Sequence, residues 1–272
     1  MKTIIVPTDF SKSASNAMVY ALQLANSFNA EVVAIHVIHP TEGVDNNIYN
    51  MYYLQDYIDQ KKKILERWVK KYSKQPDNKN LKITSICEVG YLSATLKELK
   101  VKNDALIVMG TTGASGIGAL LGSYAGQVIS NIKIPTLLLP AGTKFKTGAK
   151  FCLSSNFKNH LNEKNQITLK EIVAAHDSKI VEVLHVMDER EKAPIYKEEE
   201  FRTKNGNLNF KFHYTHDNNT VHAITNYLET NNIDILCTLT QHHNLLYRIF
   251  VEKSVTKSLA QKAITGILVL HS

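Results

Sequence analysis

Apolar residues in the first half of the chain form short runs, separated by longer stretches with helical spacing. The runs lie at residues 3–6, 31–38, 82–88, 104–109 and 136–139. Continuous apolar runs of this length are typical of strands that are covered on both faces. Helical patterns fill the intervals, at about 12–25, 48–74 and 93–101 and again before residue 136. This alternation predicts an α/β fold with a parallel sheet and right-handed crossovers.

The same order of segments begins again after residue 150. Residues 151–157 resemble 4–10, 181–188 resemble 32–39, 234–239 resemble 104–109, and 253–270 resemble 122–139. Four matches in one order indicate a duplicated domain. We therefore predict two Rossmann-like domains in tandem, over residues 1–143 and 150–272, each doubly wound around a five-stranded parallel sheet. In the second copy we expect the charged segment 188–206 to be a loop with at most a short helix.

Composition and charge exclude several classes of protein. The chain contains no run of about 18 apolar residues, so we expect no membrane span. Its first residues lack the pattern of a signal peptide, and its three cysteines are far apart, so we expect a reducing, cytoplasmic location. The net charge is +7, with many lysines in 61–74. Without an interleaved aromatic or glycine-rich motif, a solvated helix face explains these lysines better than a nucleic-acid-binding patch.

A glycine-rich loop between a strand and a helix carries the clearest chemical signal. It runs from Gly110 to Gly122, includes Gly113, and is followed by Ser123. Glycines let the backbone approach phosphate oxygens, and the start of the next helix favours an anion. The Ser123 hydroxyl can donate to a phosphate oxygen. The alternative is a flexible loop without a ligand, and loop composition alone does not decide between the two.

Two further residues follow strands that should end beside this loop. Asp9 comes after the first strand, and Val37 lies at the end of the second. Ligands of open parallel sheets bind at the carboxyl ends of strands, near the switch in strand order. There the Asp9 carboxylate can accept from a ribose hydroxyl, and the Val37 backbone can bind the edge of an adenine. The alternatives are a charge that favours a helix N-terminus for Asp9 and a core position for Val37.

These segments resemble the universal stress protein family, in its tandem two-domain form. The resemblance is carried by the opening IIVPTDFS, by His36-Val37, and by the glycine loop with Gly122-Ser123. Members with the pattern G-x2-G-x9-G-[ST] bind ATP; here the second spacing is one residue shorter, and Ala114 stands where many members have a cation. The resemblance implies a nucleotide site made by Pro7, Thr8, Asp9, Val37, Met109, Gly110, Gly113, Gly122, Ser123 and Tyr124.

The second copy loses these features. By sequence, Asp9 corresponds to Asn156, Gly110 to Thr240, Gly113 to His243 and Gly122 to Lys253, whereas Ser254 still matches Ser123. Side chains then stand where backbone should meet phosphate, so we expect one nucleotide per chain. The histidines at 213, 216, 242 and 243 do not have the spacing of a metal site, and we expect none.

The resemblance implies a stress-response protein that works as a nucleotide-dependent sensor or signalling module. Its ligand would be ATP or ADP, with AMP an alternative because the loop is short, and an accompanying Mg²⁺ is left open. A slow ATPase or autophosphorylating enzyme and a scaffold without ligand are the rival interpretations. We predict no catalytic residue, because the loop contains no charged side chain. The protein partner is unknown.

The last strands of the two copies are apolar along their length, at Ile134–Leu139 and Ile267–Leu270. Members of the resembled family dimerise through these strands, and an exposed apolar edge favours pairing. Fusion of the two copies makes that pairing intramolecular. We therefore expect an internal pseudo-dimer, with a further homodimer left open.

Overall fold

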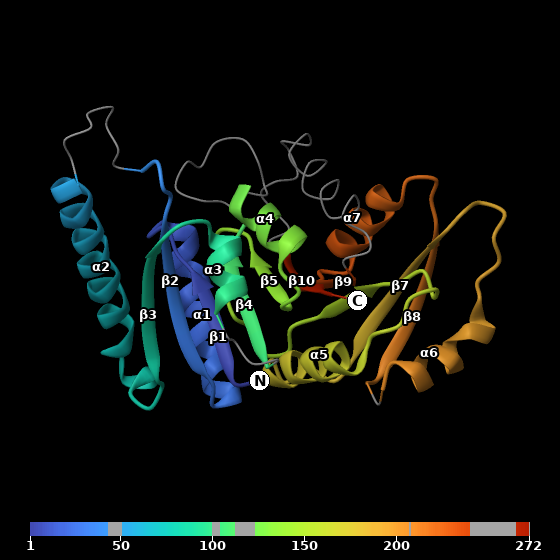
Figure 1. The fold of residues 1–272 in the computed structure, drawn as a ribbon. Coiled ribbons are helices and arrows are strands. Elements are labelled where there is room, and N and C mark those ends of the chain that lie inside the picture. Colours follow the sequence, from blue (N-terminus) through green and yellow to red (C-terminus); the bar gives the residue numbers. More distant parts are fainter. Residues whose placement is uncertain (43–50, 100–103, 112–122, 207, 240–264, 272) are drawn as a thin grey trace.

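The computed structural model describes residues 1–272 apart from 43–50, 100–103, 112–122, 207, 240–264 and 272. Strands and helices alternate through the first half (Figure 1). They are β1 (Thr3–Pro7), α1 (Lys12–Phe28), β2 (Glu31–Ile38), α2 (Met51–Ser73), the short η1 (Pro76–Asn78), β3 (Ile83–Val89), α3 (Leu92–Glu98), β4 (Ala105–Gly110), α4 (Ser123–Asn131) and β5 (Thr136–Leu139).

The second half repeats this order. Its elements are β6 (Phe151–Ser154), α5 (Glu163–Ala175), β7 (Val181–Met187), the short η2 (Ile195–Lys197), α6 (Glu198–Lys204), β8 (Phe210–His216), α7 (Thr220–Thr230), β9 (Ile235–Leu239) and β10 (Gly266–Leu270). As predicted, the charged segment after β7 holds only η2 and the seven-residue helix α6 where the first half has the long helix α2.

The ten strands of the described residues form one continuous sheet, in the order β3-β2-β1-β4-β5-β10-β9-β6-β7-β8 (Figure 1). Within each half the pairs are parallel, and the two halves have the same strand order. At the centre β5 and β10 pair antiparallel, with Leu138 opposite Ile267 and Leu137 opposite Leu268. This contact confirms the predicted pairing of the two last strands. It also joins the two expected five-stranded sheets into one.

Helices cover both faces of the sheet. Buried side chains of α1, α5 and α6 pack on one face, together with Phe151 and Phe210. Those of α3, α4 and α7 pack on the other. The apolar runs found in the sequence are the strand cores, and β4, β5, β9 and β10 are buried along almost their whole length. None of the described helices is long and apolar enough to cross a membrane.

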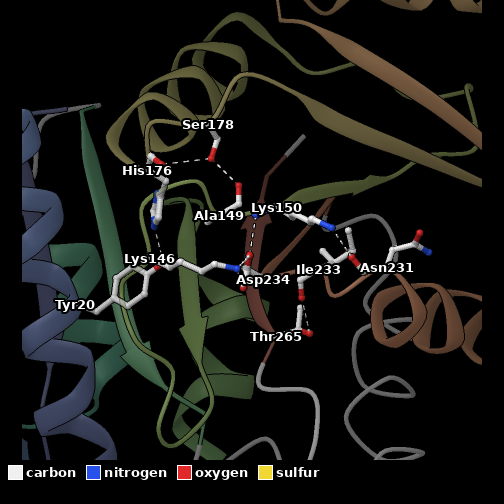
Figure 2. Close-up of polar contacts among 10 residues, drawn as sticks. All are labelled: Tyr20, Lys146, Ala149, Lys150, His176, Ser178, Asn231, Ile233, Asp234 and Thr265. Atoms are coloured by element: carbon white, nitrogen blue, oxygen red, sulfur yellow. Dashed lines mark hydrogen bonds and ion pairs between the residues drawn. The ribbon is translucent and has the colours of Figure 1, made fainter.

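Beside the central strands, polar contacts hold the linker against the second half and join α1 to the end of α5 (Figure 2). Lys146 forms an ion pair with Asp234 at 2.9 Å, and the Lys150 N–H donates to the same carboxylate. On the helical side, the Tyr20 hydroxyl of α1 lies 2.7 Å from Nε2 of His176, which follows α5. The ring of Phe145, in the linker, stacks on His176 at 4.4 Å. Contacts from both halves and the linker therefore meet at His176.

Candidate functional site

The residues that follow β1, β2 and β4 lie at one edge of the sheet, because these strands are neighbours and run parallel. Pro7 at the end of β1 is level with Ile35 of β2, and the Thr8 N–H donates to the Ile35 carbonyl at 2.8 Å. The chain winds outward from β1 to β3 and then returns to β4. The switch in strand order therefore lies between β1 and β4, where open α/β sheets form a crevice.

A tight turn joins β1 to α1. The Thr8 Oγ1 accepts from the Phe10 N–H and the Asp9 carboxylate accepts from the Ser11 N–H, both at 3.0 Å. Phe10 has φ of 65°, a conformation that is uncommon without glycine. The Ser11 hydroxyl then caps α1 by accepting from the Ala14 N–H. These bonds hold the Asp9 carboxylate at the carboxyl edge of the sheet.

His36 supports this turn from the neighbouring strand. Its side chain is buried, its Nδ1–H donates to the Thr8 carbonyl at 2.8 Å, and its ring lies 4.5 Å from that of Phe10. Burial lowers the pKa of the imidazole, so the ring is neutral near pH 7. In the described part of the chain its Nε2 has no hydrogen-bond partner. In the sequence, His36 contributed only to the family resemblance. The repeat of this histidine as His185 is the feature of the sequence that could have indicated its role in positioning the turn.

The same turn recurs in the second half. The Ser155 hydroxyl accepts from Phe157, Asn156 accepts from Lys158 at 3.0 Å, and His185 Nδ1–H donates to the Ser155 carbonyl. Phe157 also has positive φ, 58°. Asn156 reproduces the bond that Asp9 makes to its own turn. That bond is therefore part of the scaffold, and what distinguishes Asp9 is its charge.

The end of β4 comes close to the start of α1. A Cβ atom added to Gly110 would lie 2.1 Å from the Ser13 hydroxyl oxygen and 2.9 Å from the Ser13 Cβ. Glycine is therefore required here by helix packing as well as by any ligand. From the sequence, Gly110 was expected only to let a phosphate approach the backbone, and Ser13 was not identified. The close approach of α1 to the end of β4 depends on tertiary structure, which the sequence pattern does not show.

The structure brings six of the ten predicted site residues to this edge of the sheet: Pro7, Thr8, Asp9, Val37, Met109 and Gly110. Pro7, Thr8 and Met109 are buried, whereas Asp9, Val37 and Gly110 are partly exposed. Ser123 is the first residue of α4, and the Tyr124 side chain is 44% exposed. Gly113 and Gly122 lie outside the described residues.

Strand register corrects one correspondence between the two halves. Ile4 of β1 pairs with Leu106 of β4, whereas its counterpart Phe151 of β6 pairs with Ile235 of β9. Strand pairing therefore aligns Leu106 of β4 with Ile235 of β9, one residue away from the alignment made by sequence. By this alignment Gly110 corresponds to Leu239 rather than to Thr240. Leu239 is buried. A leucine side chain thus stands at the strand end where the first half has a glycine packed against Ser13. His243, Lys253 and Ser254 lie outside the described residues.

Metal and thiol chemistry find no support in the described part of the chain. No group of three or more His, Cys, Asp or Glu side chains is placed to hold a metal ion there. Cys152 and Cys237 are buried, and burial raises the pKa of all three thiols. Thiols of this kind are poor nucleophiles near pH 7.

Together, the sheet order and the helices on both of its faces define a doubly wound, Rossmann-like α/β protein. The family model for universal stress proteins matches residues 1–140. A universal stress protein of Methanocaldococcus jannaschii is 34% identical over 149 residues, covering 51% of this chain and 81% of that protein. The chain therefore belongs to the universal stress protein family.

A solved structure extends the likeness in fold to the second half. A universal stress protein from Archaeoglobus fulgidus DSM 4304 is similar over 99% of this chain and 98% of its own, with a TM-score of 0.71. The two sequences are only 15% identical. The solved protein from Archaeoglobus fulgidus therefore has the same overall fold across both halves.

Proposed function

We propose that residues 1–143 form a domain that binds one adenine nucleotide, ATP or ADP, and that residues 150–272 form a degenerate copy without a site. The observation that carries this proposal is the convergence of Asp9, Val37 and Gly110 at the switch point of the sheet. A carboxylate, a strand-end backbone and a glycine at the root of the loop before α4 are groups suited to ribose, adenine and phosphates. The buried Leu239 supports a single site per chain.

The proposed role is that of a nucleotide-dependent sensor or signalling module in the stress response, acting on a protein partner. Phosphoryl transfer requires charge neutralisation at the transferred group and an oriented nucleophile. The segment from Gly110 to Ser123 contains no Lys, Arg, Asp or Glu. Backbone donors that bind ground state and transition state equally do not raise kcat. We therefore expect single-turnover hydrolysis of Mg-ATP to be slower than about 1 s⁻¹, the low end of ordinary enzyme rates.

Isothermal titration calorimetry of the full chain with ATP and ADP tests the proposal. We expect a stoichiometry near one for the tighter nucleotide, and loss of binding in Gly113→Val because a branched side chain then enters the phosphate path. Ala114→Val is the control, since it places the same side chain at the next position, which already carries a Cβ. A stoichiometry near two would contradict the single site, and absence of binding would favour the scaffold interpretation.

A further inference from the structure

One hydroxyl at the edge of the proposed site has no partner. Ser13, in the first turn of α1, is 6% exposed, and in the described part of the chain its Oγ makes no hydrogen bond. Ser11 already caps the helix, so Ser13 is not needed for that purpose. A buried hydroxyl left unpaired is destabilising, because it loses its hydrogen bonds to water on folding without replacing them. Such a group is rare enough in native proteins to call for an explanation.

The unpaired hydroxyl lies against the root of the glycine loop. A Cβ atom on Gly110 would clash with Ser13 Oγ, so this oxygen occupies the space that a side chain at the end of β4 would take. Gly110 is the first glycine of the loop that leads to α4. Ser13 is therefore on the α1 side of the crevice, and Ser123 is at the start of the helix on the opposite face.

The first turn of α1 contains no acidic residue, and the nearest carboxylate is that of Asp9 in the preceding turn. Neither α1 nor α4 has an acidic residue in its first turn, whereas α5 has Glu163 and α6 has three glutamates there. The Ser11 N–H donates to Asp9 and the Ala14 N–H to Ser11. The N–H groups of Lys12 and Ser13 have no acceptor within the helix. A 17-residue helix therefore presents its dipole and these two N–H donors to an anion, and the Asp9 carboxylate on Ser11 offsets part of the attraction.

The second half lacks every part of this arrangement. Ser13 corresponds to His160, which lies within 3.4 Å of the Asn205 amide, and Gly110 corresponds to Leu239. Helix α5 begins only at Glu163, after the Asn162 cap. A serine at this helix position and a glycine at the strand end therefore occur together only in the half that keeps Asp9; the unpaired Thr238 hydroxyl of the second half lies within strand β9 itself.

We propose that the Ser13 hydroxyl donates to a phosphate oxygen of the bound nucleotide, which the N–H groups at the start of α1 also attract. This inference rests on the proposed function and adds a phosphate contact to it. In this arrangement the phosphates lie between the amino ends of α1 and α4. The contact compensates for the phosphate loop that is one residue short, because it supplies a donor from outside the loop.

Calorimetry of Ser13→Ala and of the control Ser15→Ala, with ATP, ADP, AMP and adenosine, tests this inference. Ser15 lies two residues along the same helix and is partly exposed. A hydrogen bond to a charged group is worth about 1.5–3 kcal/mol, so Ser13→Ala should weaken ATP binding about ten-fold or more. Adenosine binding should stay unchanged. The shortest ligand that shows the loss identifies which phosphate Ser13 contacts.

Thermal unfolding separates this role from a structural one. Without nucleotide, Ser13→Ala should be at least as stable as the natural chain, because it removes an unpaired buried hydroxyl, whereas loss of a structural hydrogen bond would lower Tm. If the natural chain binds ATP and Ser13→Ala binds it equally well, the Ser13 contact is wrong and the proposed function stands. If the natural chain binds no adenine nucleotide, both proposals are overturned.

Discussion

At the end of the first strand of each half, an aspartate and an asparagine make the same bond. Asp9 accepts from Ser11 and Asn156 accepts from Lys158, each at 3.0 Å, and the middle residue of both turns is a phenylalanine with positive φ. The two side chains have nearly the same shape and differ in charge. The turn therefore requires an acceptor two residues before the N–H, and an amide serves as well as a carboxylate. Any role of Asp9 that needs a negative charge lies outside the turn.

This equivalence gives a residue-scale prediction with an internal control. Asp9→Asn keeps the acceptor for Ser11, so its free energy of unfolding should stay within about 0.5 kcal/mol of the natural chain. Its affinity for ATP should fall about ten-fold, because a charge-assisted hydrogen bond to the ribose becomes a neutral one. Asn156→Ala should do the reverse, lowering stability by about 0.5–2 kcal/mol without changing affinity. Chemical denaturation and calorimetry measure the two effects, and equal nucleotide affinity in all three chains would remove Asp9 from the site.

At the scale of elements, the two halves share a core because their last strands pair. Leu137 of β5 and Leu268 of β10 are opposite each other, and neither is exposed. Hydrophobic residues from both halves belong to each of the two main core clusters. Elements that share a core in this way unfold together, because exposure of one strand also exposes its partner.

We therefore expect Leu268→Ala to cost about 2–5 kcal/mol, as other large-to-small substitutions in cores do. The unfolding transition should change with it: the natural chain should give one cooperative transition by circular dichroism and calorimetry, and the variant a broader or double one. Ile195→Ala is the control, since that side chain is 65% exposed and should change stability by no more than about 0.5 kcal/mol. A variant that loses stability but keeps one sharp transition would show that other contacts couple the halves.

At the scale of the whole molecule, the periodicity of apolar residues and the repeated order of segments predicted the fold. They did not predict which residues of β4 and β9 correspond. The apolar runs predicted the strands, and helix α2 was expected at 48–74 and observed at Met51–Ser73. The match of 234–239 to 104–109 was one residue out, because several apolar residues in a row fit either register. The correction to Leu239 came only from the pairing of β9 with β6. Sequence spacing cannot distinguish neighbouring registers in a strand that is apolar on both faces.

The candidate site was predicted to the extent that it depends on strand ends. Asp9, Val37 and Gly110 follow strands whose adjacency the α/β order implies, so their proximity could be anticipated. Ser13 and His36 could not be assigned roles in the same way. The relevance of Ser13 arises from a close approach between helix and strand, and that of His36 from a bond to the Thr8 carbonyl. Both depend on tertiary distances that no local pattern encodes.

The junction between the halves contains a histidine whose protonation should affect the stability of the whole chain. His176 is fully buried, and its Nδ1 lies 2.7 Å from the Ile172 carbonyl, so Nδ1–H donates there and Nε2 accepts from the Tyr20 hydroxyl. Phe145 stacks on the ring, and Asp234 is the charged group whose field reaches it. Burial lowers the pKa of His176 in spite of the favourable Ile172 and Asp234 contributions. The folded state thus holds this imidazole neutral.

A lowered pKa in the folded state makes stability depend on pH in one direction. Below about pH 6.5, the ordinary pKa of histidine, the unfolded chain binds a proton that folded His176 does not, so the free energy of unfolding decreases as pH falls. Burial likewise lowers the pKa of His36, His160 and His213, which add to the slope. Urea denaturation between pH 8 and 5 should therefore show constant stability above about pH 7 and a progressive loss below it. His176→Asn should be less stable at pH 8 but lose less on acidification, and an unchanged pH slope in this variant would show that His176 is not one of the groups responsible.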